Sequence, residues 1–219
     1  MRCASSHLSL APGSSATRPN MTHFRQIFDQ ETLAFTYLLG DDSGAAILID
    51  AGSERTPLPV LAILAELNLR LDYLLQTHLH DDEPNDAAAL KERTGARVVA
   101  SEAFMASADI PVRHGTTISF GSELVHVIGT PGHTSGCLSY LWHDRVFTGD
   151  ALLIGSCGRT ELQGGDPAAL YDSITHRLFV LPGETLVFPG HARHGRTVST
   201  IAEERERNPA IAGCSRDEF

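Results

Sequence analysis

Four short segments share one pattern, in which an apolar run ends in a Gly- or Thr-containing turn that is followed by His or Asp. The segments are LLQTHLH, VIGTPGH, VFTGD and LVFPGH. They deliver His78, His80, His133, Asp150 and His191. Imidazole and carboxylate groups are ligands for iron, zinc and manganese, and functional side chains collect where strands of a rigid scaffold end. Each histidine alone is better explained as a structural or surface residue, but the pattern shared by all four segments predicts a metal site.

The stretch THLHDDEPND, residues 77–86, is the densest of these segments, with two histidines and four acids. This density raises the question of whether the chain holds one metal ion or two. Asp82 also stands where a helix N-cap is expected, and the two roles are compatible.

The first half of the chain is predicted to place these residues on alternating strands and helices. Residues 35–50 read as two strands joined by a polar turn, and residues 71–76 as a buried strand that ends at His78. Between them, leucines at 58, 61, 64 and 67 predict a helix with one face on a sheet. A second helix is expected from Pro84 to Gly95, followed by a strand at 96–101.

The second half is richer in strand patterns. Strands are expected at residues 116–121, 123–130, 138–144, 145–150 and 185–190. Helices are expected at 167–178 and within 197–210, where the charge run is typical of a solvated face. This mixture predicts an α/β (α+β) fold in which two mixed β-sheets pack together and are flanked by helices.

Composition limits the function classes. The 219 residues suit one domain, and the formal net charge of −10 argues against a nucleic-acid partner. No apolar run reaches the roughly 18 residues of a membrane helix, so no membrane association is expected. The four cysteines, Cys3, Cys137, Cys157 and Cys214, are far apart in the sequence and indicate a reducing compartment without a disulfide framework.

Residues 1–20 contain five serines, two arginines and no acid. They are expected to be a disordered extension, with residues 21–219 as the folded domain. A cytoplasmic location is expected, or the mitochondrial matrix if residues 1–20 are a transit peptide.

With these residues in view, the chain resembles the metallo-β-lactamase superfamily, whose fold is an αβ/βα sandwich with the metal site at one edge. The superfamily motif HxHxDH matches at His78, His80 and Asp82. Its last histidine is replaced by Glu83, and PND follows. Because that histidine helps to bind the second metal in hydrolytic members, the substitution favours a site with one metal.

The sequence is most similar to the persulfide dioxygenases. The resemblance is carried by TYLL, TPGHTSGC, GDALLIGSCGRTELQ, LPGETLVFPGH and TVSTIAEERERNP. It implies one Fe(II) per chain, held by His78, His133 and Asp150. It further implies that His80, Asp82 and His191 act in catalysis by orienting ligands and substrate.

The resemblance implies glutathione persulfide and O2 as substrates, with sulfite and glutathione as products. Arg159 is the candidate for a glutathione carboxylate, or else a partner of a structural ion pair. Tyr171 offers a hydroxyl contact, or else belongs to the core. Cys157 is not expected to be a nucleophile, since the sequence places no base beside it. Family members are often dimers, so a homodimer is possible.

Two other functions stay open. One is a zinc hydrolase of glutathione thioesters of the glyoxalase II type, against which stand Glu83 and the short extension of 28 residues after His191. The other is an inactive member that binds glutathione or a protein partner, since the altered loop after His80 could block the metal site.

Overall fold

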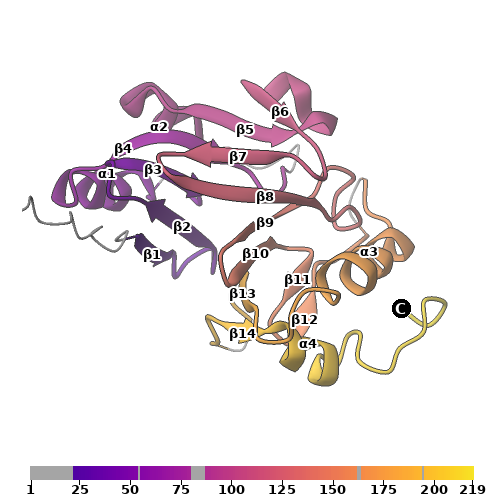
Figure 1. Cartoon of the computed structure of the whole chain (residues 1–219). Coiled ribbons are helices and arrows are strands. Elements are labelled where there is room, and N and C mark those ends of the chain that lie inside the picture. Colours follow the sequence, from indigo (N-terminus) through magenta and orange to yellow (C-terminus); the bar gives the residue numbers. More distant parts are fainter. Residues whose placement is uncertain (1–21, 54, 80–86, 162–163, 194) are drawn as a thin grey trace, which may run out of the picture.

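The computed structural model describes residues 22–53, 55–79, 87–161, 164–193 and 195–219. Two six-stranded sheets lie face to face, and helices cover their outer sides (Figure 1). Residues 1–20, and the predicted extension with them, lie outside the described residues. None of the helices described is long and apolar enough to cross a membrane.

The first sheet is mixed and has the order β1-β2-β3-β4-β5-β6. Its strands are β1 (His23–Phe28), β2 (Phe35–Gly40), β3 (Ala45–Ile49), β4 (Arg70–Leu75), β5 (Arg97–Ser101) and β6 (Ile110–Val112). The pairs β1–β2 and β2–β3 are antiparallel, whereas β3, β4, β5 and β6 are mutually parallel. The predicted hairpin at 35–50 and the interior strand that ends before His78 are confirmed.

The second sheet is also mixed and has the order β14-β13-β10-β9-β8-β7. Its strands are β7 (Thr117–Phe120), β8 (Glu123–Gly129), β9 (Leu138–Trp142), β10 (Arg145–Gly149), β13 (Leu186–Pro189) and β14 (Ser199–Thr200). A small hairpin, β11 (Leu152–Leu153) and β12 (Ser156–Cys157), follows β10. Because β10 and β13 are parallel neighbours, their carboxyl ends reach the same edge of the sheet.

The helices divide between the two outer faces. The structure describes α1 (Pro57–Glu66), α2 (Ala87–Thr94), the 3₁₀ helix η1 (Glu102–Ser107), α3 (Pro167–Ser173), the π-helical turn η2 (Ile174–Leu178) and α4 (Ile201–Arg207). Apolar residues of α1 and α2 pack on the first sheet, and those of α3, η2 and α4 on the second.

The buried face of α1 differs from the predicted leucine stripe. Val60 and Leu64 are buried, whereas Leu58 is 68% exposed. Helical spacing alone therefore located the helix but not its inward face, which depends on how the first turn meets the sheet.

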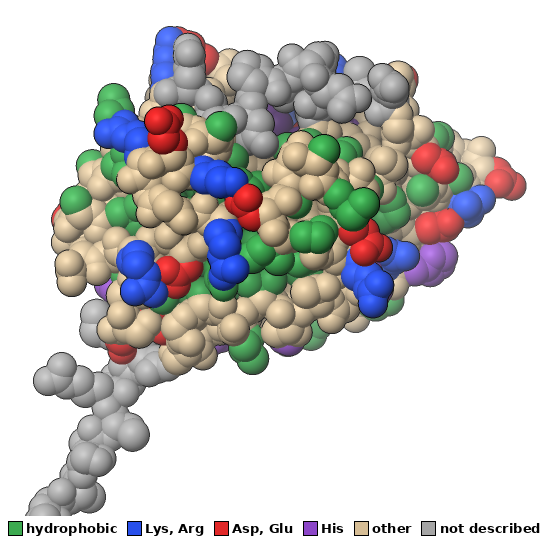
Figure 2. Space-filling view, turned by 90° about the horizontal axis from the view of Figure 1, so that it is seen from above, with side chains coloured by type: hydrophobic (Ala, Val, Ile, Leu, Met, Phe, Trp, Pro, Cys, Tyr) green, Lys and Arg blue, Asp and Glu red, His purple; other side chains and the backbone are tan. Residues whose placement is uncertain are grey.

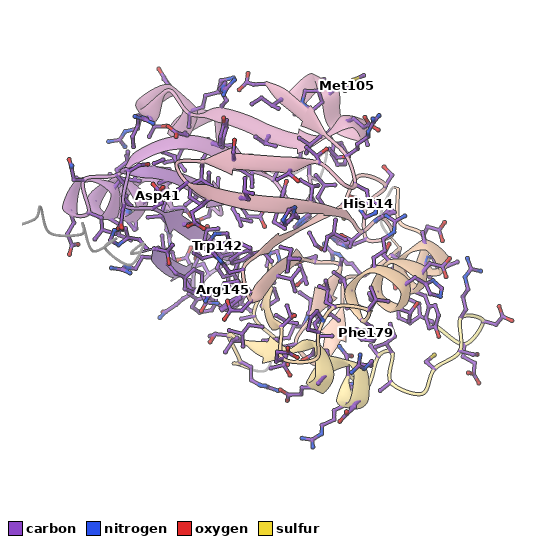
Figure 3. All side chains as sticks on the ribbon, in the orientation of Figure 1. Asp41, Met105, His114, Trp142, Arg145 and Phe179 are labelled. Atoms are coloured by element: carbon purple, nitrogen blue, oxygen red, sulfur yellow. The ribbon has the colours of Figure 1, made fainter. Side chains whose placement is uncertain are left out.

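The core between the sheets follows the period of two of a strand. Along β2, Tyr37 and Leu39 face the second sheet, whereas Leu38 faces the helices. Strands buried on both faces read as continuous apolar runs, and this explains the sequence of β2 and β3. The aromatic part of the core is closed by Arg145, which lies against Trp142 (Figure 3) with its guanidinium carbon 5.3 Å from the ring centroid.

The face of the molecule in Figure 2 carries charges of both signs. On its described part, Lys and Arg side chains lie beside Asp and Glu, and hydrophobic side chains are scattered between them. Positive charge is therefore not gathered into one basic patch on this part of the surface.

Candidate metal centre

The four sequence segments end at one edge of the sandwich. His78 follows β4, His133 follows β8, and Asp150 and His191 follow the parallel strands β10 and β13. The two sheets are joined at this edge by a hydrogen bond from Leu138 N to Thr77 O, 2.7 Å long. The topology thus brings together side chains that are up to 113 positions apart, from residue 78 to residue 191.

Three of these side chains form a group that could hold a metal ion. One ligand atom each from His78, His133 and Asp150 lies within 4.8 Å of the others. The rings of His78 and His133 meet edge to face, with centroids 5.2 Å apart. His133 is buried and the other two are partly buried, so the group faces a pocket from a protected position.

His78 is oriented by a relay that starts on Asp50. The Asp50 carboxylate accepts hydrogen bonds from Thr77 N (2.8 Å) and from Thr77 Oγ1 (2.7 Å). Since the Thr77 hydroxyl proton is used there, its oxygen accepts from Nδ1 of His78, 2.8 Å away. This tautomer puts the ligand lone pair of His78 on Nε2.

An ionised Asp50 is energetically unfavourable at this position. Burial raises its pKa to about 6, although the two hydrogen bonds from Thr77 lower it. Asp50 also has a positive φ of 54°. A partly buried acid with strained backbone that holds a ligand loop is typical of a functional site.

His133 is oriented by the backbone. Its Nδ1 donates to the carbonyl oxygen of Arg159 at 2.7 Å, which again leaves Nε2 as the ligand atom. The same Nε2 lies 3.9 Å from Oδ2 of Asp150.

Asp150 receives its orienting hydrogen bond from His191, whose Nδ1 is 2.7 Å from Oδ1. Oδ2 is then the oxygen on the side of the other two ligand atoms. Burial alone would raise the pKa of Asp150, but the hydrogen bond from His191 and the nearby imidazoles outweigh it and hold the pKa well below its usual range. The carboxylate is thus kept ionised, which is the form that binds metal.

This donor set fits a metal ion of the first transition row. Two imidazole nitrogens and one carboxylate oxygen converge, and the far side of each group is fixed by a hydrogen bond. Two histidines and one carboxylate on one face of an ion leave further positions for substrates, as in non-haem iron oxygenases.

A pocket of about 420 Å³ opens beside two of the three candidate ligands, His133 and Asp150. It is lined by Thr32, Leu33, His133, Asp150, Leu153, Gly158, Arg159, His191, Ala192 and Arg193. No hydrogen bond or ion pair joins the guanidinium groups of Arg159 and Arg193 to any residue that the structure describes. Two cations in the lining of the pocket suit an anionic ligand.

Sequence reasoning missed Arg193. Its signal was present, since it stands two positions after His191 in the same strand-end loop, as Arg159 stands nine positions after Asp150.

The structure places Tyr171 away from the pocket. Its hydroxyl donates to the carbonyl of Cys214 at 3.0 Å, and its ring packs 5.5 Å from that of Phe219. Burial raises the pKa of the Cys157 thiol, which disfavours a thiolate nucleophile. Cys137, Cys157 and Cys214 are free thiols. His80, Asp82 and Glu83 lie outside the described residues, so their predicted roles stay predictions.

Comparison with known proteins places the chain in a family whose members share this fold. Residues 30–191 match the family model of the metallo-beta-lactamase superfamily. The chain belongs to the metallo-β-lactamase superfamily. The sandwich fold is the one expected for the superfamily, and the residues that could bind a metal lie at the expected edge of it.

Within the superfamily the chain belongs to the persulfide dioxygenase family. It is 41% identical to the human mitochondrial persulfide dioxygenase ETHE1, over 100% of this chain and 85% of the human protein. The crystal structure of ETHE1 from Myxococcus xanthus is 49% identical and superposes with a TM-score of 0.86, covering 90% of this chain and 88% of that one.

A hydrolase relative matches a smaller part. The hydroxyacylglutathione hydrolase of Cereibacter sphaeroides is 38% identical over 68% of this chain and 62% of its own length. The shorter overlap fits a shared superfamily domain.

The relay to His78 gives a prediction for Asp50→Asn. An asparagine keeps the shape, but its amide NH₂ cannot accept from Thr77. Thr77 and His78 should lose their fixed orientation, so the metal affinity is expected to fall about 10- to 100-fold, as for other residues that orient ligands. Titration with a metal-competing chelator measures this. An affinity equal to that of the wild type would contradict the relay.

Proposed function

We propose that this persulfide dioxygenase family member is a mononuclear Fe(II) enzyme that oxidises glutathione persulfide with O2. The balanced reaction takes one persulfide, one O2 and one water to one glutathione and one sulfurous acid, which ionises to sulfite. The observation that carries the proposal is the relation to a persulfide dioxygenase over the whole chain. The group of two histidines and one aspartate supports it independently, since this set suits ferrous iron.

The chain's own residues would prepare the reaction. His78, His133 and Asp150 would hold the iron, which when bound would offer coordination positions for the persulfide sulfur and O2 and pass electrons from the sulfur to O2. His191 keeps a proton on Nδ1 at Asp150 Oδ1 and so fixes the carboxylate plane. The carbonyl of Arg159 does the same for the His133 ring.

The side chains of Arg159 and Arg193 would bind the carboxylates of the glutathione part. Both line the pocket, and guanidinium groups pair bidentately with carboxylates. Arg193 is an addition to the residues expected from sequence.

Replacing either arginine is expected to raise the KM for the substrate more than it lowers kcat. For Arg159→Ala and Arg193→Ala, the KM for glutathione persulfide should rise at least about tenfold, because a hydrogen bond to a charged group contributes roughly 1.5–3 kcal/mol and about 1.4 kcal/mol is tenfold. The KM of Arg159→Lys should lie between those of the wild type and Arg159→Ala, since lysine keeps the charge but not the planar, bidentate geometry of the guanidinium group. Steady-state O2 uptake gives KM and kcat. Arg25→Ala, an exposed arginine on β1, is the control and should keep the wild-type KM.

The proposal is tested on protein purified without oxygen and loaded with iron. O2 uptake with glutathione persulfide, with sulfite formed in equal amount, is the expected result. About two zinc ions per chain together with cleavage of S-lactoylglutathione would instead establish the hydrolase. Stoichiometric iron without turnover of either substrate would favour the inactive binding protein.

Location and assembly are further parts of the proposal. The human relative is named as mitochondrial, and a matrix location for this chain requires residues 1–20 to act as a transit peptide. A fluorescent fusion of residues 1–20 tests this. Light scattering during gel filtration tests the predicted homodimer.

A further inference from the structure

The turn between β1 and β2, residues 29–34, supplies Thr32 and Leu33 to the lining of the pocket and is held by hydrogen bonds. The Asp29 carboxylate accepts hydrogen bonds from Glu31 N (2.9 Å) and Thr32 N (3.4 Å), and its other oxygen accepts from the Ser53 hydroxyl. The turn therefore has a built conformation, fixed from within and from the loop after β3.

The end of this turn is attached to the strand end that supplies His191. Ala192 N donates to Leu33 O at 2.7 Å, and Ala34 and His191 form a β-bridge. Leu33 thus lies next to His191 in space, at the rim of the metal pocket.

Leu33 is an unusual residue at this position for two reasons. Its φ is 60°, in the left-handed region that side chains larger than glycine rarely adopt. Leu33 is also 48% exposed, so it contributes little to the packing of the core. Neither backbone preference nor core packing explains a leucine here.

Leu33 offers the largest exposed apolar side chain among the described residues that line the pocket. Leu153 is 1% exposed, and Ala192 has only a methyl group. The remaining lining side chains that the structure describes are polar or charged, apart from Gly158. Backbone strain such as that at Leu33 persists only where the surrounding structure maintains it, and it is common in residues that act in a functional site.

We infer that Leu33 is a substrate-contact residue whose side chain forms the apolar wall beside His191. The cysteinyl methylene and the two sulfur atoms of a glutathione-type persulfide lie against it, while the carboxylates face the arginines. This inference rests on the proposed function, since it concerns the same pocket. The turn 29–34 would then select an organic persulfide that has an apolar segment next to its sulfur atoms.

The test separates a contact role from a structural one by replacing Leu33 with residues that suit its backbone. Leu33→Asn and Leu33→Gly both relieve the left-handed strain, and both remove the wall. The KM for glutathione persulfide and the Kd for glutathione, measured by calorimetry on metal-loaded protein, are expected to rise at least about fivefold. The melting temperature should stay the same or rise, which a merely structural leucine would not allow.

Two further variants complete the design. Leu33→Met restores an apolar wall and should return the KM to within about twofold of the wild type. Leu124→Asn replaces a leucine that is 52% exposed at the far end of β8, and it should leave KM and Kd unchanged.

Each outcome decides the inference. If KM and Kd of the Asn and Gly variants stay within twofold of the wild type, Leu33 is not a contact residue. If the Asn variant does not fold, the Gly variant decides by the same criterion. Wild-type protein that neither binds glutathione nor consumes persulfide would instead overturn the proposed function.

Discussion

Asp150→Asn is expected to abolish metal binding and persulfide oxidation while leaving the fold intact. The amide has the shape of the carboxylate and can still accept from His191 Nδ1, now 2.7 Å from Oδ1. It lacks the negative charge that the surrounding imidazoles stabilise by keeping the pKa of Asp150 low. Metal affinity should therefore fall more than about 100-fold, beyond the loss typical of residues that only orient ligands.

The stability of the variant separates this effect from unfolding. Iron or zinc should raise the melting temperature of the wild type, because a ligand that binds only the native state stabilises it, and should not raise that of Asp150→Asn. Without metal, the variant should stay folded but melt lower than the wild type near neutral pH, because the depressed pKa means that the folded state stabilises the Asp150 carboxylate.

Asp41→Asn is the matched control for Asp150→Asn. Asp41 is a buried acid that accepts hydrogen bonds from Ser43 and Ser122. It follows β2, which is antiparallel to β3, so it lies at the opposite edge of the sheet from the metal ligands. This variant should lose stability and keep its full metal content. Normal metal content in Asp150→Asn, measured by mass spectrometry of the eluted metal, would show that Asp150 is not a ligand.

The sequence predicted the interior strands well because they bury both faces. Residues 71–76 and 185–190 contain apolar runs that no exposed segment could carry, and β4 and β13 occupy them. The edge strand β1 was missed for the opposite reason. Its apolar residues Phe24, Ile27 and Phe28 have helical spacing, and only pairing with β2 makes the segment a strand.

The metal ligands could be proposed from strand ends, but their orientation could not. The tautomer of His133 depends on the backbone carbonyl of Arg159, and every residue type has a carbonyl. The orientation of His78 depends on Asp50, 27 positions before Thr77, and the parallel pairing of β3 with β4 brings the two together. Tertiary contacts of this kind leave no local pattern in the sequence.

The orientation of the Tyr171 side chain also depends on a tertiary contact. The residue begins an apolar helix face, and sequence spacing does not say whether its hydroxyl points to the pocket. The C-terminal segment decides this, because Cys214 supplies the acceptor and Phe219 the ring beside it. A partner so far along the chain could not be assigned from the helix alone.

Gly158→Ala is expected to damage the metal site by contact alone, without changing any ligand. A Cβ at this position would lie 2.2 Å from the carbonyl oxygen of Asp150 and 2.9 Å from the His133 ring. Both contacts are too short for real atoms, and neither neighbour is the end of a flexible chain. The backbone at 158 must therefore move, and the carbonyl of the adjacent Arg159, which orients His133, must move with it.

The expected result has two parts. The free energy of unfolding should fall by about 1–3 kcal/mol, as for other overpacked positions, measured by urea denaturation. The metal affinity should fall as well, at least about tenfold, because the Nε2 of His133 no longer points at the other ligands. Loss of affinity in the fraction that remains folded would separate the second effect from the first.

Gly155→Ala provides the control in the same loop. Gly155 has a φ of 67°, and a methyl group added there would have no neighbour within 4 Å, so alanine meets only backbone strain of roughly 1–2 kcal/mol. The two variants should thus lose similar stability, but only Gly158→Ala should lose metal. If both bound metal equally well, the close packing of Gly158 against the ligands would not be what orients His133. In that outcome the Arg159 carbonyl would have kept its hydrogen bond from His133 Nδ1 despite the added methyl group.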